Sequence, residues 1–296
     1  MTGIDFDFAR YVARRKGAVY QRARDGAAYS YSGDRKLRRA LGTARPVSMT
    51  IDAVSSRWRS SAREELLGTS VRVTTDDFTQ VRRAATTAGE RLGVELPPIY
   101  VTSDPRVRAN TLGTNDDPYI FIHADLVDGL GNDELLAVIG NELGHVQNNH
   151  VIYQTALFYL EHAAALFVRW AVKPATMTLQ AWSRRAEITC DRAALICARD
   201  FDAALSALVK LAVEPEVAAD MDVRDYLDQL PQSRKGLGKY AELFHSNPYL
   251  PKRVGALEVF ARSAYYHNVS KPGSDADEGL SADDVDAQVA EILKVF

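Results

Sequence analysis

The sequence of 296 residues has only two cysteines, Cys190 and Cys197. Two cysteines are too few for a disulfide scaffold, and no third or fourth is present for a zinc cluster of cysteines. They lie seven residues apart in a segment that we expect to be helical, so we predict two buried thiols in a reducing compartment. Neither the 18 glycines nor the 11 prolines are in excess, which argues against a collagen-like or low-complexity chain.

Long hydrophobic runs and a secretory leader are also missing. Residues 1–17 lack an apolar core and carry two early aspartates, unlike a signal peptide. The most apolar stretch, residues 150–174, is interrupted by Glu161, His162 and Arg169, whereas a membrane span needs about 20 mostly apolar residues. We predict a buried helix there, with a membrane-contacting helix as the alternative. We therefore expect a cytoplasmic protein without a transmembrane segment.

The composition is typical of a globular protein, with 46% hydrophobic and 25% charged residues. Such a length allows one or two domains with a sizeable core. Charge is unevenly placed, because residues 1–45 hold 11 Lys/Arg and 4 Asp and the remaining residues then carry a net charge of −10. This basic arm either contacts phosphates of nucleic acid or lipid or packs on the acidic body, and no nucleic-acid-binding motif favours the first.

Hydrophobic periodicity predicts a mostly helical α+β body. We expect helices over 74–93, 132–150, 182–200, 201–214 and 251–266, and short strands over 97–102 and 118–123. In the first helix Phe78 and Val81 share the apolar face and Gly93 ends it. After a linker at 272–274, Ser281 is typical of the N-cap of a short acidic helix.

The helix predicted at 132–150 contains Asn141-Glu142-Leu143-Gly144-His145. Zinc peptidases carry His-Glu-x-x-His on a helix, because residues four apart lie on one face and the Glu acts as general base on a metal-bound water. The frame is the same here, but Asn141 occupies the first ligand position. Taken alone, these five residues are also compatible with an exposed Glu and a hydrogen-bonded His on an ordinary helix.

Two later segments strengthen the metal-site interpretation. Glu187 follows His145 by 42 residues on a second predicted helix, and Asp191 lies four residues further along the same face. This is the layout of a carboxylate ligand followed by an aspartate that orients a ligand histidine. A third segment, SNPYLPKRVGALEVFARS, places Arg253 ahead of another helix.

With these three segments in this order, residues 70–266 resemble the zinc peptidases of the HtpX and CAAX-prenyl-protease type, which are gluzincins. The resemblance implies a mostly helical zincin-like fold with a small mixed sheet and an active-site helix. It also implies an edge strand near RANTLGTN that binds an extended peptide through main-chain hydrogen bonds. We divide the chain into a basic helical arm (1–68), a gluzincin-like domain (69–268) and an acidic linker with a C-terminal helix (269–296).

The resemblance also implies a role for each matching residue. Glu142 matches the general base, His145 and Glu187 match zinc ligands, Asp191 matches the partner of a ligand, and Arg253 matches an arginine that braces the site.

Two positions depart from the family pattern. Asn141 stands where the first zinc-binding histidine belongs, and Asn247 stands where a histidine thought to stabilise the tetrahedral intermediate belongs. A neutral amide oxygen is a poor zinc ligand, which leaves two protein ligands where catalytic zinc normally has three. Losing an oxyanion donor costs on the order of 10²–10³ in rate. We therefore expect zinc to bind weakly or not at all.

Two other histidines were considered as replacement ligands. His245 lies in a predicted loop two residues before Asn247, from which it could swing in. His150 lies five residues after His145, about 140° further round a continuous helix, so we expect it to face elsewhere and to be structural.

Three hypotheses follow from these features. In the first, the protein is a pseudoenzyme that binds peptides or a partner protein in its groove. In the second, it is an active zinc metalloendopeptidase with an altered ligand set, in which Asn141 binds through its amide oxygen or His245 helps, or in which Asn141 is an engineered inactivation of an active enzyme. In the third, it is an interaction protein that acts through its basic arm.

Overall fold

The computed structural model describes residues 26–162, 173–213, 222, 224–225, 250–271 and 279–294. Residues 1–25 of the basic arm, His245, Asn247 and the linker predicted at 272–274 lie outside these residues. The expectations for those segments therefore stay predictions.

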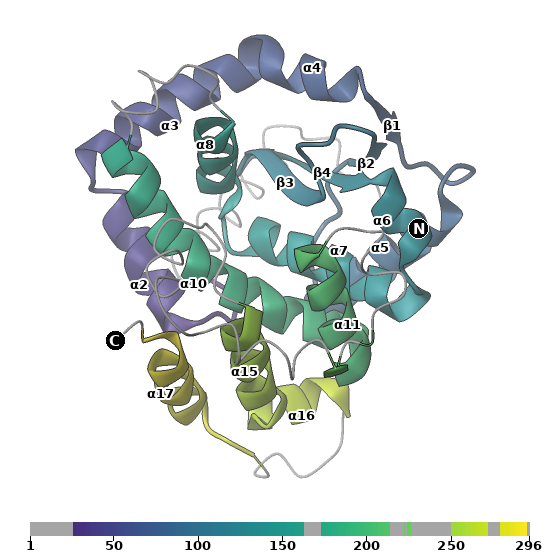
Figure 1. Ribbon diagram of the computed structural model, residues 1–296, viewed down its shortest axis with the longest axis vertical. Helices are drawn as coiled ribbons and strands as arrows, with labels where there is room; N and C mark the ends of the chain where they lie inside the picture. The colour runs from purple at the N-terminus through teal and green to yellow at the C-terminus, as the bar shows by residue number, and fades with distance from the viewer. Residues whose placement is uncertain are drawn as a thin grey trace, which may run out of the picture.

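The described part is mostly helical, with one small sheet (Figure 1). The helices before the sheet are α2 (Ser32–Leu41), α3 (Arg45–Arg57), the π-helical η1 (Trp58–Ala62) and α4 (Arg63–Leu67). Those that follow β1 are α5 (Thr79–Leu92), α6 (Ala124–Gly129), α7 (Asn132–Gln147), α8 (Val151–Glu161), α10 (Lys173–Ala198), α11 (Phe201–Ala212), α15 (Leu250–Ala261), α16 (Ala264–Ser270) and α17 (Ala282–Leu293). Each predicted helix therefore has a counterpart, and the α+β class is confirmed.

The sheet is mixed and has the order β1-β2-β4-β3. Its strands are β1 (Ser70–Arg72), β2 (Ile99–Thr102), β3 (Ala109–Thr114) and β4 (Asp117–His123). Strands β2 and β4 run parallel, whereas both outer pairs are antiparallel. The two predicted strands are confirmed as β2 and β4, and the polar segment between them forms the edge strand β3.

Helix α5 begins later than the periodicity predicts. The Thr74 hydroxyl accepts hydrogen bonds from the N–H groups of Asp76 and Asp77, so a turn occupies the residues before the helix. Phe78 follows this turn with a left-handed φ of 54° and is 37% exposed. Its predicted place on the buried face beside Val81 is wrong, whereas Gly93 ends the helix at a φ of 65° as predicted.

The first part of the predicted long apolar helix corresponds to α8. Five apolar side chains of α8 are buried: Val151, Ala156, Leu157, Phe158 and Leu160. Among the helices of the described residues, none combines the length and the apolarity needed to cross a bilayer.

Helices α7 and α10 cross at the centre of the fold (Figure 1). Two glycines on α7 permit the close contact. A Cβ added at Gly140 would lie 2.6 Å from Cβ of Cys197, and one added at Gly144 would lie 3.0 Å from Cβ of Ala193 and 3.2 Å from Cα of Cys190. The absence of side chains at these two positions therefore brings the backbone of α10 close to the end of α7.

Replacing Gly140 with alanine is expected to lower the free energy of unfolding by about 1–3 kcal/mol, because the added methyl overlaps Cys197. Helix propensity alone would make the alanine variant more stable by about 1 kcal/mol. A loss of stability would therefore show that the contact with Cys197 outweighs helix propensity. Gly129→Ala is the matched control, since nothing lies within 4 Å of a Cβ there. Urea denaturation of both variants tests this, and a Gly140→Ala protein as stable as the parent would contradict the close contact.

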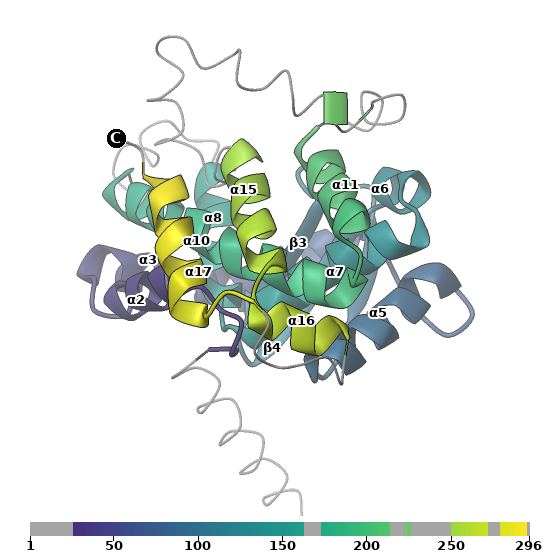
Figure 2. The same cartoon turned by 90° about the horizontal axis from the view of Figure 1, so that it is seen from below.

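The two ends of the described chain meet on α10. Arg192 Nη1 donates to the carbonyl oxygen of Tyr29 at 3.0 Å, and Nη2 donates to Asp286 Oδ1 on α17 at 2.9 Å. Its guanidinium also lies 5.1 Å from the centre of the Phe260 ring on α15, and Figure 2 shows α15 and α17 side by side. The predicted N-cap of α17 is confirmed, because Ser281 Oγ accepts a hydrogen bond from the N–H of Asp284 at 3.2 Å.

Candidate metal centre

Six of the seven predicted site residues lie together, on three helices. Asn141, Glu142 and His145 come from α7, Glu187 and Asp191 come from α10, and Arg253 comes from the first half of α15. All six are buried, with at most 8% of any of them exposed. The seventh, Asn247, lies outside the described residues.

His145 faces the carboxylate of Glu187. Its Nε2 lies 3.5 Å from Glu187 Oε1, and both groups are buried. Gln154 on α8 donates to the same Oε1 at 3.3 Å. No local sequence pattern points to Gln154, because it lies 33 residues from Glu187 in the chain.

Arg253 joins the two carboxylates of α10. Its Nε lies 2.9 Å from Asp191 Oδ2 and its Nη2 lies 2.6 Å from Oδ1, which is a two-pronged pair. The same Nη2 lies 3.1 Å from Glu187 Oε2. Asn141 completes the group, because its Nδ2 donates to Asp191 Oδ1 at 3.2 Å.

These contacts set the protonation of the group. Burial acts to raise the pKa of Glu187, but Arg253 and His145 outweigh it and hold that pKa at about 2. Burial acts to lower the pKa of His145, and the facing Glu187 reverses this, so the net shift is upward. For Asp191, burial raises the pKa in spite of the guanidinium. The site therefore combines a charged Glu187 with a guanidinium and with a histidine whose pKa is raised.

Glu142 points to the sheet. Thr111 on β3 donates from its hydroxyl to Glu142 Oε2 at 2.7 Å, in a fully buried contact. Burial raises the pKa of Glu142, although His145 and Thr111 act against it. A carboxyl group with a raised pKa is suited to taking up and returning a proton. Thr111 was not predicted, because it lies 31 residues away in the sequence.

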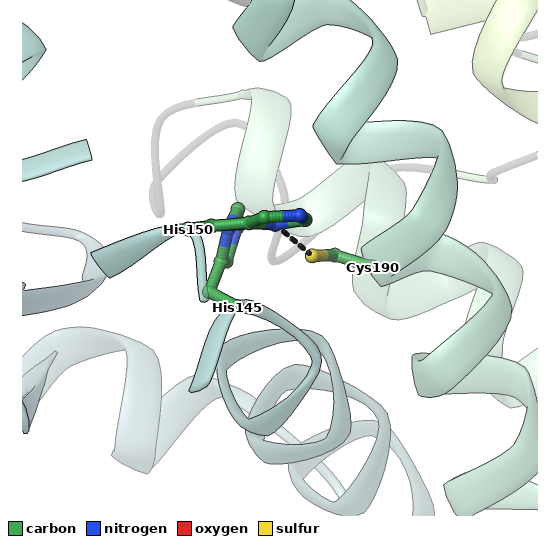
Figure 3. Close-up of side chains that lie close together, drawn as sticks. All are labelled: His145, His150 and Cys190. Atoms are coloured by element: carbon green, nitrogen blue, oxygen red, sulfur yellow. Dashed lines mark hydrogen bonds between the residues drawn. The ribbon is translucent and has the colours of Figure 1, made fainter. Parts of the chain in front are cut away.

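A second cluster forms on the other side of the His145 ring, where His145, His150 and Cys190 converge (Figure 3). The two Nδ1 atoms are 3.3 Å apart, and Cys190 Sγ lies 3.8 Å from Nδ1 of His150. One ligand atom of each residue lies within 4.8 Å of those of the other two, and all three residues are buried, so this group could hold a metal ion.

This cluster corrects two predictions. The helix does not continue to His150, because α7 ends at Gln147 and Asn149 takes a left-handed φ of 57°. The turn swings His150 back toward His145, instead of leaving it on another face. Cys190 and Cys197 are both buried and free as predicted, but Cys190 lies among possible metal ligands.

His150 is in turn backed by a buried carboxylate from α2. Its Nε2 lies 3.1 Å from Asp34 Oδ2, although it is not well aligned for a hydrogen bond. Thr189 donates to the same Oδ2 at 2.7 Å, and Trp182 Nε1 donates to Oδ1 at 3.0 Å. Burial acts to raise the pKa of Asp34, but His150 and these donors lower it overall. No sequence signal pointed to Asp34, which lies in the segment predicted as a basic arm.

A small pocket borders Asn141 and Asp191. Its empty space of about 250 Å³ includes some open solvent. Most of the lining is apolar and comes from α7, α10, α11 and α15, including Ala137, Val138, Ala194, Ala204, Leu208 and Leu257. Such a lining is suited to an apolar side chain of a bound molecule.

Comparison with known proteins adds to this geometry. Residues 76–261 match Peptidase family M48. The chain is 32% identical over 222 residues to the plastoglobule-localized metallopeptidase 48, chloroplastic, of Arabidopsis thaliana. The aligned region covers 70% of this chain and 64% of that protein. It is 26% identical to a protease HtpX homolog of Bacteroides fragilis (57% of this chain, 64% of that protein) and 23% identical to protease HtpX of Shewanella pealeana (71% and 83%).

The chain spans 64% of the length of the first two of these relatives. No solved structure gave a significant match. The cytoplasmic location stays a prediction, since one relative is named for plastoglobules of the chloroplast. The matched residues cover well over half of the chain and include α5 to α15, the helices and strands that form the site. The chain belongs to peptidase family M48.

Proposed function

We propose that this chain is an M48 peptidase homologue with a degenerate catalytic zinc position, and that it binds a peptide or partner protein segment without cutting it. The observation that carries the proposal is the contact of Asn141. Where the family pattern has a zinc-binding histidine, this side chain instead directs its amide nitrogen to Asp191, at 3.2 Å. An amide N–H group donates hydrogen bonds and cannot bind a cation.

Membership of the family implies zinc, so the donors present can be tested for fit. His145 Nε2 and Glu187 Oε1 are 3.5 Å apart, close to the separation of about 3.3 Å between two ligands of one tetrahedral zinc ion. Within the described residues, no third histidine, cysteine or carboxylate groups with this pair of atoms. Two ligands are one fewer than a catalytic zinc site needs, so these residues do not fit the family's zinc.

The charges support the same conclusion. Arg253 places a guanidinium 3.1 Å from Glu187 Oε2, and a pair of hydrogen bonds ties it to Asp191. Both carboxylates thus have a permanent cationic partner within the protein. The charges of this network are therefore satisfied without an ion.

The edge of the sheet supports peptide binding. His123 N–H donates to the carbonyl of Arg108, which makes these two residues a hydrogen-bonded pair of the β3–β4 ladder. In an antiparallel ladder every second residue is bonded to the partner strand, so the main-chain groups of Ala109, Thr111 and Gly113 point away from β4. Thr155 on α8 accepts the N–H of Gly113 at 2.8 Å. The outward groups of Ala109 and Thr111 are then positioned for an added strand, beside the buried Glu142.

A second function is favoured by one observation. Glu142 keeps a raised pKa and a hydrogen bond to Thr111, as a general base would require. This supports an active metalloendopeptidase with an altered ligand set, or one inactivated by engineering at Asn141. An interaction protein acting through its basic arm is the remaining alternative.

The test is an assay of the full chain against a broad library of unstructured peptides, with added zinc and with a chelator. We expect peptides to bind and no zinc-dependent cleavage to occur. Ala109→Pro should weaken binding at least tenfold, because proline removes an outward N–H without removing a bond between β3 and β4. Ala109→Val is the matched control, since it keeps the N–H. Chelator-sensitive cleavage by the unmodified chain would overturn the proposal in favour of the active enzyme.

A further inference from the structure

We propose that His145, His150 and Cys190 form a buried zinc-type metal site that is distinct from the catalytic position of the family. The ion would be held by Nδ1 of both histidines and by Sγ of Cys190. The family position would instead use Nε2 of His145, on the opposite side of the ring. The inference is independent of whether the chain cleaves peptides.

Two of the three distances between the donor atoms are close to those of one tetrahedral ion, and the third is below 4.8 Å. With zinc–nitrogen bonds of about 2.0 Å and zinc–sulfur bonds of about 2.3 Å, two nitrogens are about 3.3 Å apart and a nitrogen and a sulfur about 3.5 Å apart. The two Nδ1 atoms lie 3.3 Å apart, and Nδ1 of His150 lies 3.8 Å from Cys190 Sγ. The amide nitrogen of Gln154 lies 3.4 Å from Nδ1 of His145, so a water molecule or the turned amide would have to complete the shell of four ligands.

Each of the two rings has a carboxylate near its Nε2 atom, which leaves its Nδ1 atom for another partner. Asp34 lies 3.1 Å from Nε2 of His150 and Glu187 lies 3.5 Å from Nε2 of His145. A carboxylate favours the proton on the nitrogen that faces it, which leaves a lone pair on each Nδ1. The two Nδ1 atoms lie 3.3 Å apart, and a metal ion between them would accept both lone pairs.

Both rings are also held as metal-binding histidines are held in proteins. Histidine ligands almost always have a carboxylate, carbonyl or water at their second ring nitrogen, which fixes the ring and increases its basicity. Here Asp34 lies 3.1 Å from Nε2 of His150, without the alignment of a hydrogen bond, and Glu187 lies 3.5 Å from Nε2 of His145. Asp34 is itself fixed by Thr189 and Trp182, so its position does not depend on a metal.

The donor set and its burial indicate which ion binds and what it does. Two imidazoles and a thiol suit zinc and its substitute cobalt, and do not suit calcium or magnesium, which take oxygen ligands. Burial raises the pKa of Cys190, so without a metal it is a neutral thiol. Coordination takes the thiolate, and its proton leaves to solvent. Since His150 and Cys190 are 0% exposed, the ion would have a structural role, tying α7, the start of α8 and α10 together.

Cobalt titration of the full chain, freed of metal with a chelator, tests the site. We expect about one Co²⁺ per chain, with the near-ultraviolet absorption of a cobalt–thiolate bond and the visible bands of a tetrahedral ion. Cys190→Ser should remove the thiolate absorption and weaken binding at least tenfold. Cys197→Ser is the matched control, because it changes the other buried thiol of the same helix and should leave the spectrum unchanged.

Two results would overturn the site. One is the absence of both cobalt and zinc binding to the full chain. The other is a cobalt spectrum without thiolate absorption that Cys190→Ser leaves unchanged. If Cys190→Ser fails to fold, X-ray absorption on the zinc-loaded parent decides, since the site requires one sulfur at about 2.3 Å from the zinc.

Discussion

Replacing Arg253 with methionine is expected to lower the free energy of unfolding by about 3–5 kcal/mol, the range for breaking a buried ion pair by removing one partner. Arg253 is 6% exposed and is the cation that contacts both Asp191 and Glu187. Without it, two buried carboxylates must stay charged without that partner or take up protons. Burial already raises the pKa of Asp191, so this group is the first expected to protonate in the variant.

Urea denaturation at neutral pH measures the loss. Arg262→Met is the matched control, because Arg262 is exposed just after the end of the same helix, and its loss should cost at most about 0.5 kcal/mol. Arg253→Met combined with Asp191→Asn should cost less than the sum of the two single changes, because the residues interact directly. A cost below about 1 kcal/mol for Arg253→Met would show that the carboxylates do not depend on the guanidinium.

Replacing both Asn141 and Asn247 with histidine is expected to give zinc-dependent peptide hydrolysis at least about 10³ above the parent chain. Loss of a residue that only contacts a metal ligand costs about 10–100-fold in activity, so restoring a ligand itself should gain at least that much. Restoring an oxyanion donor should raise the rate by a further factor of about 10²–10³. Because ligand and donor act at separate steps, the two gains should multiply. Cleavage of a fluorogenic peptide library, with and without chelator, measures the change.

Two variants serve as controls for this gain. Glu142→Gln in the doubly changed chain should remove the hydrolysis, since Glu142 is the proposed general base. Asn132→His adds a histidine at the exposed start of α7 and should give no activity. A doubly changed chain that folds, binds zinc and still does not cleave would show that the family chemistry has been lost at other positions too.

The same reversion should move the metal. A neutral imidazole has one lone pair, so His145 binds an ion through either Nε2 or Nδ1 and not through both. With a histidine at position 141, Nε2 of His145 is expected to bind, and the thiolate absorption of the cobalt protein should fall. The metal content would then stay near one per chain while the spectrum changes.

Much of the site could be predicted from the sequence because its residues obey local rules. Asn141 and His145 are one turn apart on α7, as are Glu187 and Asp191 on α10, and helical spacing alone puts each pair on one face. The strands β2 and β4 and the cap at Ser281 also follow from short patterns. The prediction that Phe78 lies on the buried face of α5 was wrong, because the Thr74 side chain stabilises a turn before the helix that hydrophobic periodicity cannot reveal.

The amino-acid sequence was enough to predict the family, the α+β class and the residues of α7, α10 and α15 that form the candidate site. The groups that contact these residues became visible in the folded chain: Thr111 at Glu142, Asp34 at His150, and Cys190 beside two imidazoles. The physical reason is that local patterns fix which face of a helix a side chain occupies. The partner across a helix crossing depends instead on how closely the backbones approach, here through Gly140 and Gly144, and on where α7 ends.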